Sequence, residues 1–305
     1  MSNEYAKYLA KHRADFIKLT DIQNRELAKL YIQAAAEIKE RAELIINKKG
    51  LTYAAAKIRI KSLLIEAGRL SDNFKGILDK SLIDSANLGT VVNKIIMKSY
   101  QESLAEEGVK LNLTRILSKV SNEAVKAVYN RIWTDGLKLS DRVWLLDRRT
   151  KQEIERIVMQ NIVSGGAASD KTVISALENL LNPEYTPAKL TSLHGRKVGY
   201  EASRLLRTST SEAFNEGDRL SNKANPGVTG ETWLAGPGAC DDCLSNDGQD
   251  VNDVGYPPAH PSCRCTTLAK VMSVEAFTSS WIDFMDNPDK YPQYQDWLID
   301  VYKAA

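Results

Sequence analysis

The distribution of proline constrains this chain more than any other feature of its sequence. None of its nine prolines precedes Pro183, so the first 182 residues contain no proline at all. Because proline removes a backbone donor and breaks the interior of a helix, so long a stretch without it can be helical almost throughout. We therefore expect a helical N-terminal part, followed by a C-terminal part that is richer in turns and loops.

Apolar residues recur at helical spacing through the proline-free part. Leu27, Ile38 and Ile45 belong to one such series, which predicts a long helix over residues 4–48, with a break near Thr20–Asp21 as an alternative. Further helices are predicted near residues 52–68, 72–85, 88–107, 111–135, 150–163, 170–181 and 189–223. The expected fold class is mainly α, with an N-terminal helical bundle or elongated arm followed by a small α+β domain. The predicted domains are residues 1–138, 139–273 and a tail over 274–305.

All four cysteines fall within one short segment, which lies between two predicted strands over residues 231–234 and 266–269. A C-x-x-C pair is followed, after sixteen residues, by a run that reads His-Pro-Ser-Cys-Arg-Cys. The segment over residues 240–265, called the knuckle below, therefore offers five candidate metal ligands: Cys240, Cys243, His260, Cys263 and Cys265. Zinc prefers thiolate and imidazole ligands, and four of them close a structural site. A structural zinc is the main expectation, and disulfides or free thiols are the alternatives. His260 is either a ligand, in place of Cys263 or Cys265, or a neighbour of the ligands.

The net charge of +2 conceals a gradient along the chain. Residues 1–150 carry nine more basic than acidic side chains, whereas residues 241–305 carry seven more acidic than basic ones. A basic helical region suits contact with double-stranded DNA, because neutralising phosphates releases counterions whatever the sequence. No base-reading motif is present, so any such contact is expected to lack sequence preference. The candidate contacts are Lys48, Lys49, Arg148, Arg149 and Lys151.

A longer pattern surrounds the cysteines. It comprises Trp233, Cys240-x-x-Cys243, Asp247-Gly248 and Pro257-Pro258-x-His260-Pro261-x-Cys263-Arg264-Cys265. Upstream stand Leu139-Ser140-Asp141-Arg142-Val143-Trp144, Gly165-Gly166 and Ala202-Ser203-Arg204-Leu205-Leu206-Arg207-Thr208. Together these motifs resemble the phage Mu protein F-like head morphogenesis family, and the resemblance covers about residues 139–269.

The resemblance implies a structural minor head (capsid) protein of a tailed phage. Such a protein would be present at low copy number in the virion and would be built into the procapsid in the host cytoplasm. Its partners would be the portal and other head proteins, and it would contact packaged DNA or help its ejection. The alternative from another class is a DNA-associated regulatory or packaging accessory protein with a structural zinc site.

Neither catalysis nor a membrane span is expected. The three histidines, His12, His194 and His260, have no neighbouring nucleophile or paired carboxylate at helical or strand spacing. The chain contains no phosphate loop and no G-x-S-x-G elbow, and no small-molecule substrate is expected. A calcium loop starting at Asp250 fails, because Pro261 stands where the bidentate Glu is needed. Charged residues interrupt every apolar stretch, which argues against a spanning helix.

The tail over residues 274–305 combines six acidic residues with seven aromatic ones. Its apolar residues form two stripes at helical spacing, separated by Pro288 and Pro292. Two short helices are therefore expected. They either pack on the C-terminal domain of the chain itself or dock on a partner in the phage head, with Phe277, Trp281 and Trp297 as anchors.

Overall fold

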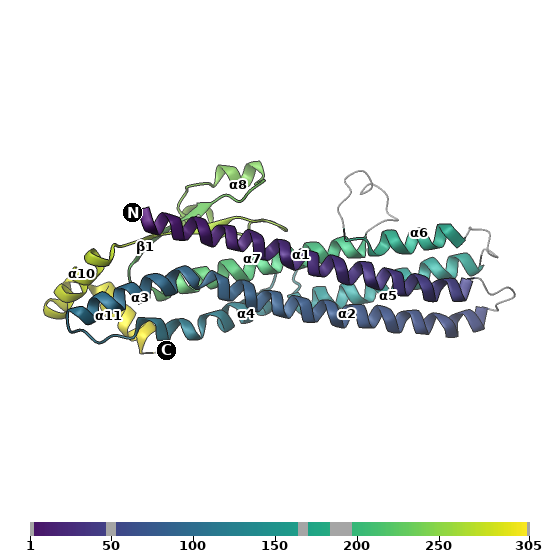
Figure 1. Cartoon of the computed structure of the whole chain (residues 1–305), viewed down its shortest axis with the longest axis horizontal. Coiled ribbons are helices and arrows are strands. Elements are labelled where there is room, and N and C mark those ends of the chain that lie inside the picture. Colours follow the sequence, from purple (N-terminus) through teal and green to yellow (C-terminus); the bar gives the residue numbers. More distant parts are fainter. Residues whose placement is uncertain (1–2, 47–52, 164–169, 184–196, 304–305) are drawn as a thin grey trace. The chain divides into compact units, whose positions relative to one another are not determined.

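The computed structural model describes residues 3–46, 53–163, 170–183 and 197–303. They form mainly α-helices with one small antiparallel sheet, which confirms the predicted fold class (Figure 1). The helices of the first part are α1 (Asn3–Ile46), α2 (Tyr53–Gly89), α3 (Val91–Glu106), η1 (Leu113–Ser118), α4 (Val120–Asn130), α5 (Leu139–Val163) and α6 (Asp170–Leu181). The remaining elements are α7 (Val198–Ala224), β1 (Val228–Leu234), α8 (Asp241–Ser245), α9 (Val251–Val254), β2 (Thr266–Val271), α10 (Val274–Asp286), η3 (Pro288–Lys290), α11 (Pro292–Trp297) and η4 (Leu298–Tyr302). Within the described ranges, no helix is both long and apolar enough to cross a lipid bilayer.

Most predicted helices are confirmed, and the differences have local causes. The break expected near Gly68 is wrong, because α2 runs through it. A single glycine costs a helix only about 1 kcal/mol relative to alanine, and the neighbouring Leu70 and Phe74 are buried. The single helix predicted over 111–135 is also wrong, because the 3₁₀ turn η1 precedes α4. Helix α5 begins at Leu139 rather than near residue 150.

The chain forms two compact units that do not follow the boundaries predicted after residues 138 and 273. Unit 1 comprises residues 1–20, 81–130 and 207–305, and unit 2 comprises residues 21–80 and 131–206. The difference arises because α1, α2 and α7 are long enough to contribute residues to both units. The predicted domains are consecutive stretches of the sequence, whereas each of these units combines segments that lie far apart in the sequence.

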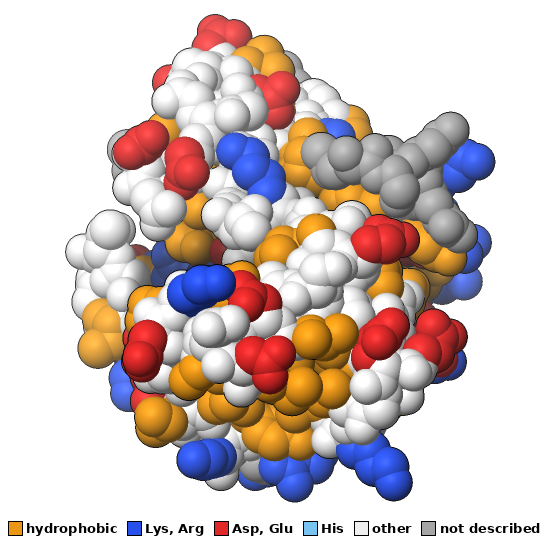
Figure 2. All heavy atoms as spheres, turned by 90° about the vertical axis from the view of Figure 1, so that its left-hand side faces the viewer, with side chains coloured by type: hydrophobic (Ala, Val, Ile, Leu, Met, Phe, Trp, Pro, Cys, Tyr) orange, Lys and Arg blue, Asp and Glu red, His pale blue; other side chains and the backbone are white. Residues whose placement is uncertain are grey.

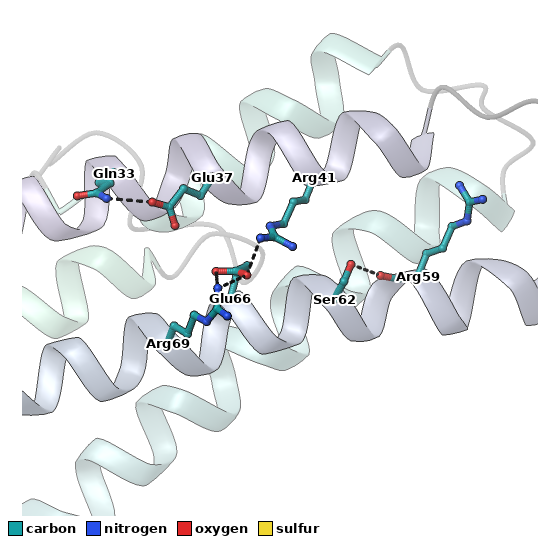
Figure 3. A network of polar contacts seen from close by, with 7 residues as sticks. All are labelled: Gln33, Glu37, Arg41, Arg59, Ser62, Glu66 and Arg69. Atoms are coloured by element: carbon teal, nitrogen blue, oxygen red, sulfur yellow. Dashed lines mark hydrogen bonds and ion pairs between the residues drawn. The ribbon is translucent and has the colours of Figure 1, made fainter.

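Unit 2 contains a buried carboxylate that two arginines neutralise. Glu66 on α2 accepts ion pairs at 2.8 Å from Arg41 on α1 and from Arg69 one turn along its own helix (Figure 3). Only 5% of the Glu66 side chain is exposed. A buried charge is tolerated only when it is paired and hydrogen-bonded. The cluster therefore fixes how α1 packs against α2 within this unit.

In unit 1, glycines bring two helices into close contact. A Cβ atom at Gly89 of α2 would collide with the carbonyl oxygen of Phe214 on α7, and one at Gly217 of α7 would collide with the backbone of Ala86. Only glycine allows two helix backbones to approach so closely. The pair of glycines therefore sets the crossing of α2 and α7 in unit 1.

The tail packs inside unit 1 of the chain itself, but mainly on helices α3 and η1 and not on the C-terminal domain that the sequence suggested. Helix α10 lies against α3, and the aromatic side chains of the tail join one hydrophobic core with residues of α3 and η1 (Figure 1). The ring of Phe277 stacks on that of Tyr100 with centroids 4.1 Å apart. Figure 2 shows this end of the molecule, where acidic side chains are scattered around a group of hydrophobic ones.

The assignment of Phe277, Trp281 and Trp297 as docking anchors is wrong. Their exposed fractions are 0%, 3% and 6%, so they are not available to a partner. The indole N–H of Trp297 donates to the carbonyl oxygen of Ala224, so the polar group of this side chain is hydrogen-bonded inside the core. These three residues therefore belong to the interior of unit 1.

Candidate metal centre

The two strands hold the ends of the knuckle together. Strands β1 and β2 pair in antiparallel fashion, with Leu234 opposite Thr266 at the end from which the knuckle emerges. Gly236 and Cys265 therefore lie side by side, and the Gly236 N–H donates to the Cys265 Sγ at 3.3 Å. Such a bond to sulfur favours a thiolate, as in a metal ligand.

All five predicted donors converge inside the knuckle as two groups of three. The outer group is Cys240, Cys243 and His260, and the inner group is Cys243, Cys263 and Cys265, each with its donor atoms within 4.8 Å of one another. The sulfurs of Cys243 and Cys263 are 3.7 Å apart. Two thiolates on one tetrahedral ion with bonds of about 2.3 Å would be about 3.8 Å apart. The spacing of this pair therefore suits two ligands of one tetrahedral metal ion, and Cys243 is common to both groups.

His260 lies in the position of a ligand. Its Nε2 is 3.3 Å from the sulfur of Cys240 and 3.2 Å from that of Cys243. Its Nδ1 is 3.0 Å from the carbonyl oxygen of Pro261 and can donate a hydrogen bond to it. Metal-binding histidines typically use their second nitrogen in this way, which fixes the tautomer that leaves Nε2 free for the metal.

No disulfide joins the four cysteines in the structure, and the surroundings shift the pKa values of two of these thiols in opposite directions. All four cysteines are free, and Cys240 alone is exposed. The backbone N–H of Cys243 lowers the pKa of Cys240, whereas burial raises the pKa of Cys243 to about 12. A buried thiol of this kind loses its proton when a metal binds, so metal affinity should increase with pH.

Residues of the longer motif build the frame of the knuckle. The backbone N–H of Ala235 donates to Asp247 Oδ1 at 2.7 Å. Trp233 exchanges backbone hydrogen bonds with the 248–249 turn, accepting from Gly248 N–H and donating to the Gln249 carbonyl oxygen. Its buried ring packs against Cys243, Cys263 and Cys265. The motif therefore marks one structural unit, in which these neighbours hold the donors in place.

Helix α7 holds the knuckle in place through two hydrogen bonds that were not predicted from the sequence. Thr208 Oγ1 accepts a hydrogen bond of 2.9 Å from the backbone N–H of Ser262, which adopts a positive φ of 64° between His260 and Cys263. Asn215 donates to the carbonyl oxygen of Cys265 at 3.1 Å. The run of polar residues in this part of α7 was the available signal, because polar side chains on a buried helix face need partners.

The candidate DNA-binding residues do not form one group of free cations. Arg149 pairs with Glu201 at 2.5 Å and Lys151 with Asp147 at 2.8 Å, both within unit 2. Arg148 lies over the ring of Trp144 at 5.4 Å from its centroid. Lys48 and Lys49 lie outside the described residues, as do His194 and the Gly165-Gly166 pair.

Gly236→Ala is expected to destabilise the knuckle by about 1–3 kcal/mol, the range of overpacked buried sites. The new Cβ atom would collide with the carbonyl oxygen of Arg264 and displace the N–H that bonds to Cys265. Urea unfolding of the metal-loaded protein measures the effect. Gly230→Ala on β1 is the matched control, because its Cβ would meet only the Lys270 side chain, at 3.7 Å. Equal stability of the two variants would contradict the role given to Gly236.

The fold and the cluster define a class of protein: mainly α-helical, with a small α+β region whose Cys/His group can hold a metal ion. Comparisons of the chain with protein-family models, with curated proteins and with solved structures find no match.

Proposed function

We propose that this chain is a structural minor head protein of a tailed phage, which takes part in procapsid assembly next to the portal. The observation that carries the proposal is that the residues resembling the head morphogenesis signature meet at one place. Trp233, Asp247 and the five donors all belong to the knuckle or its frame. Thr208, from the upstream part of the signature, bonds to the same knuckle.

The metal that we propose for the knuckle is zinc. Four thiols and one imidazole are soft or borderline donors, which favour zinc over magnesium or calcium. Five donors can fill all four tetrahedral positions and leave none open for a water molecule, so the role is structural rather than catalytic. We assign Cys243 to the ion, because it belongs to both groups of donors, and the other three ligands come from Cys240, His260, Cys263 and Cys265.

We further propose that contact with double-stranded DNA, where it occurs, involves unit 2. The segments of this unit carry 24 basic and 17 acidic residues. An excess of this size supports weak attraction to phosphate without base recognition. The head protein is therefore retained by its protein partners, and DNA contact is secondary.

Co-expression with the portal and head proteins of a tailed phage tests the proposal. The chain should sediment with procapsids at low copy number, and the Cys243→Ser variant should be lost from them. Ser245→Ala, a change on the same short helix that removes no metal donor, is the control. Absence of the wild-type chain from procapsids, together with binding to DNA of one defined sequence, would favour the regulatory alternative.

A further inference from the structure

A buried carboxyl group in unit 1 has no cation to neutralise it. Asp218 on α7 lies where α1, α3 and the sheet meet, and its Oδ2 accepts a 2.6 Å hydrogen bond from Thr267 Oγ1 on β2. Among the described residues, no lysine, arginine or histidine forms an ion pair with it. The group borders a cavity of about 20 Å³, which has room for one water molecule.

The charged and titratable groups around Asp218 are engaged elsewhere. From α1, Tyr5 donates to the Ala269 carbonyl oxygen, His12 bonds to the Leu88 carbonyl oxygen, and Arg13 donates to the Ala235 carbonyl oxygen. From β1, Glu231 accepts hydrogen bonds from Asn222 and Tyr256, and its negative charge opposes ionisation of Asp218. On α7 itself, Arg219 pairs with Glu216. Helix α3 adds the uncharged Asn93, and β2 adds the hydroxyl groups of Thr266 and Thr267.

The hydrogen bonds of Tyr5, His12 and Arg13 also hold residues 3–20 of α1 on the rest of unit 1. Besides the three polar contacts, the ring of Phe16 stacks on that of Phe214, one turn before Asp218, with centroids 4.1 Å apart. His12 also packs on Phe214, at 5.1 Å. Tyr5, Leu9, His12 and Arg13 line the cavity that Asp218 borders, and Asp218 is 8% exposed, so undocking of the segment would open this cavity to bulk water.

We propose that Asp218 is a proton-dependent latch, which keeps residues 3–20 of α1 docked on unit 1 while it is protonated and releases them when it ionises. Ionising a buried carboxyl group that no cation neutralises is unfavourable, even though Thr267 donates a hydrogen bond to it. Undocking of the segment lets water solvate the charge, at the expense of the few contacts described above. Local opening of this kind requires less free energy than unfolding of the whole unit.

The direction of the pH dependence follows from the environment of the group. Burial is the main cause that raises the pKa of Asp218, from 3.8 to about 7. The docked state therefore binds a proton more tightly than the undocked state, in which the carboxyl group is solvated. Docking is fully favoured below pH 4, weakens by about tenfold per pH unit between 4 and 7, and levels off above 7. Burial lowers the pKa of His12 from 6.5, so docking disfavours its charged form, and the contribution of this ring opposes the trend below pH 6.5.

Hydrogen exchange of the intact protein between pH 5 and 8 tests the latch, after correction for the intrinsic pH dependence of exchange. The opening constant of residues 3–20 should rise about a hundredfold over this range in His12→Gln, which lacks the opposing titration, and by a smaller factor in the wild type. Asp218→Asn preserves the shape of the side chain without its charge and should abolish that rise. Asp289→Asn, at an exposed position of the same unit, should leave it unchanged.

Two outcomes would overturn the proposal. One is a rise of the opening constant with pH that persists in Asp218→Asn, or that is absent from His12→Gln. The other is an equal loss of protection in α3 and α10, which would mean that the whole unit unfolds and the segment does not open locally. A correctly folded Asp218→Asn protein is recognised by wild-type protection of α3 at pH 5, so a folding failure cannot be mistaken for either result.

Discussion

Chelating the metal from the reduced protein is expected to unfold residues 229–270 while the long helices remain intact. A structural zinc contributes its binding free energy to the segment that supplies its ligands, and this amounts to about 10–16 kcal/mol in small zinc-binding peptides. Metal analysis should give about one zinc per chain. Hydrogen exchange should locate the loss of protection in β1, the knuckle and β2, and circular dichroism should change little.

The ligand variants should fall in a definite order. Cys243→Ser should mimic chelation, because Cys243 belongs to both groups of donors and is buried. Cys240→Ser should be milder, since Cys240 is exposed and belongs only to the outer group. Ser245→Ala on α8 should bind zinc normally. Protein that contains no zinc after purification under reducing conditions, or disulfides found by mass spectrometry, would refute the metal site.

Deletion of residues 274–305 is expected to leave unit 1 unfolded or aggregated. The tail supplies five buried aromatic residues to the core around Tyr100. Without them, the apolar faces of α3 and η1 would be exposed to water. Solubility and near-ultraviolet circular dichroism of the truncated chain measure the outcome.

A single substitution tests the same core more gently. Trp281→Ala should reduce the free energy of unfolding by about 3–5 kcal/mol, as expected for a large buried aromatic side chain. Trp281 is 3% exposed and packs against the rings of Phe284, Tyr294 and Trp297. Met285→Ala, at a position that is 53% exposed on the same helix, should cost less than 1 kcal/mol. Similar losses for the two variants would show that the tail is not part of the core.

The sequence predicted elements that depend on local patterns and missed features that depend on tertiary contacts. The sequence predicted helix α1, the two strands and the five candidate metal donors. These features were predictable because apolar periodicity and ligand spacing are visible within short stretches of sequence. The continuation of α2 through Gly68 was not predictable, because burial of the neighbouring residues overrides the weak preference of glycine against a helix. The bond from Ser262 to Thr208 was equally hidden, since it joins residues 54 positions apart.

The composition of unit 1 has a consequence for synthesis on the ribosome. Its contacts join the two ends of the sequence: the hydroxyl of Tyr5 bonds to Ala269, 264 residues away. Unit 2 has all its residues once position 206 has been translated, whereas unit 1 must wait for residues 207–305. At common elongation rates this delay is about 5–20 s. During that interval residues 3–20 of α1 would lack the contacts that bury Phe16 in the folded unit, and they would reach their native place only after residues 207–305 have been made.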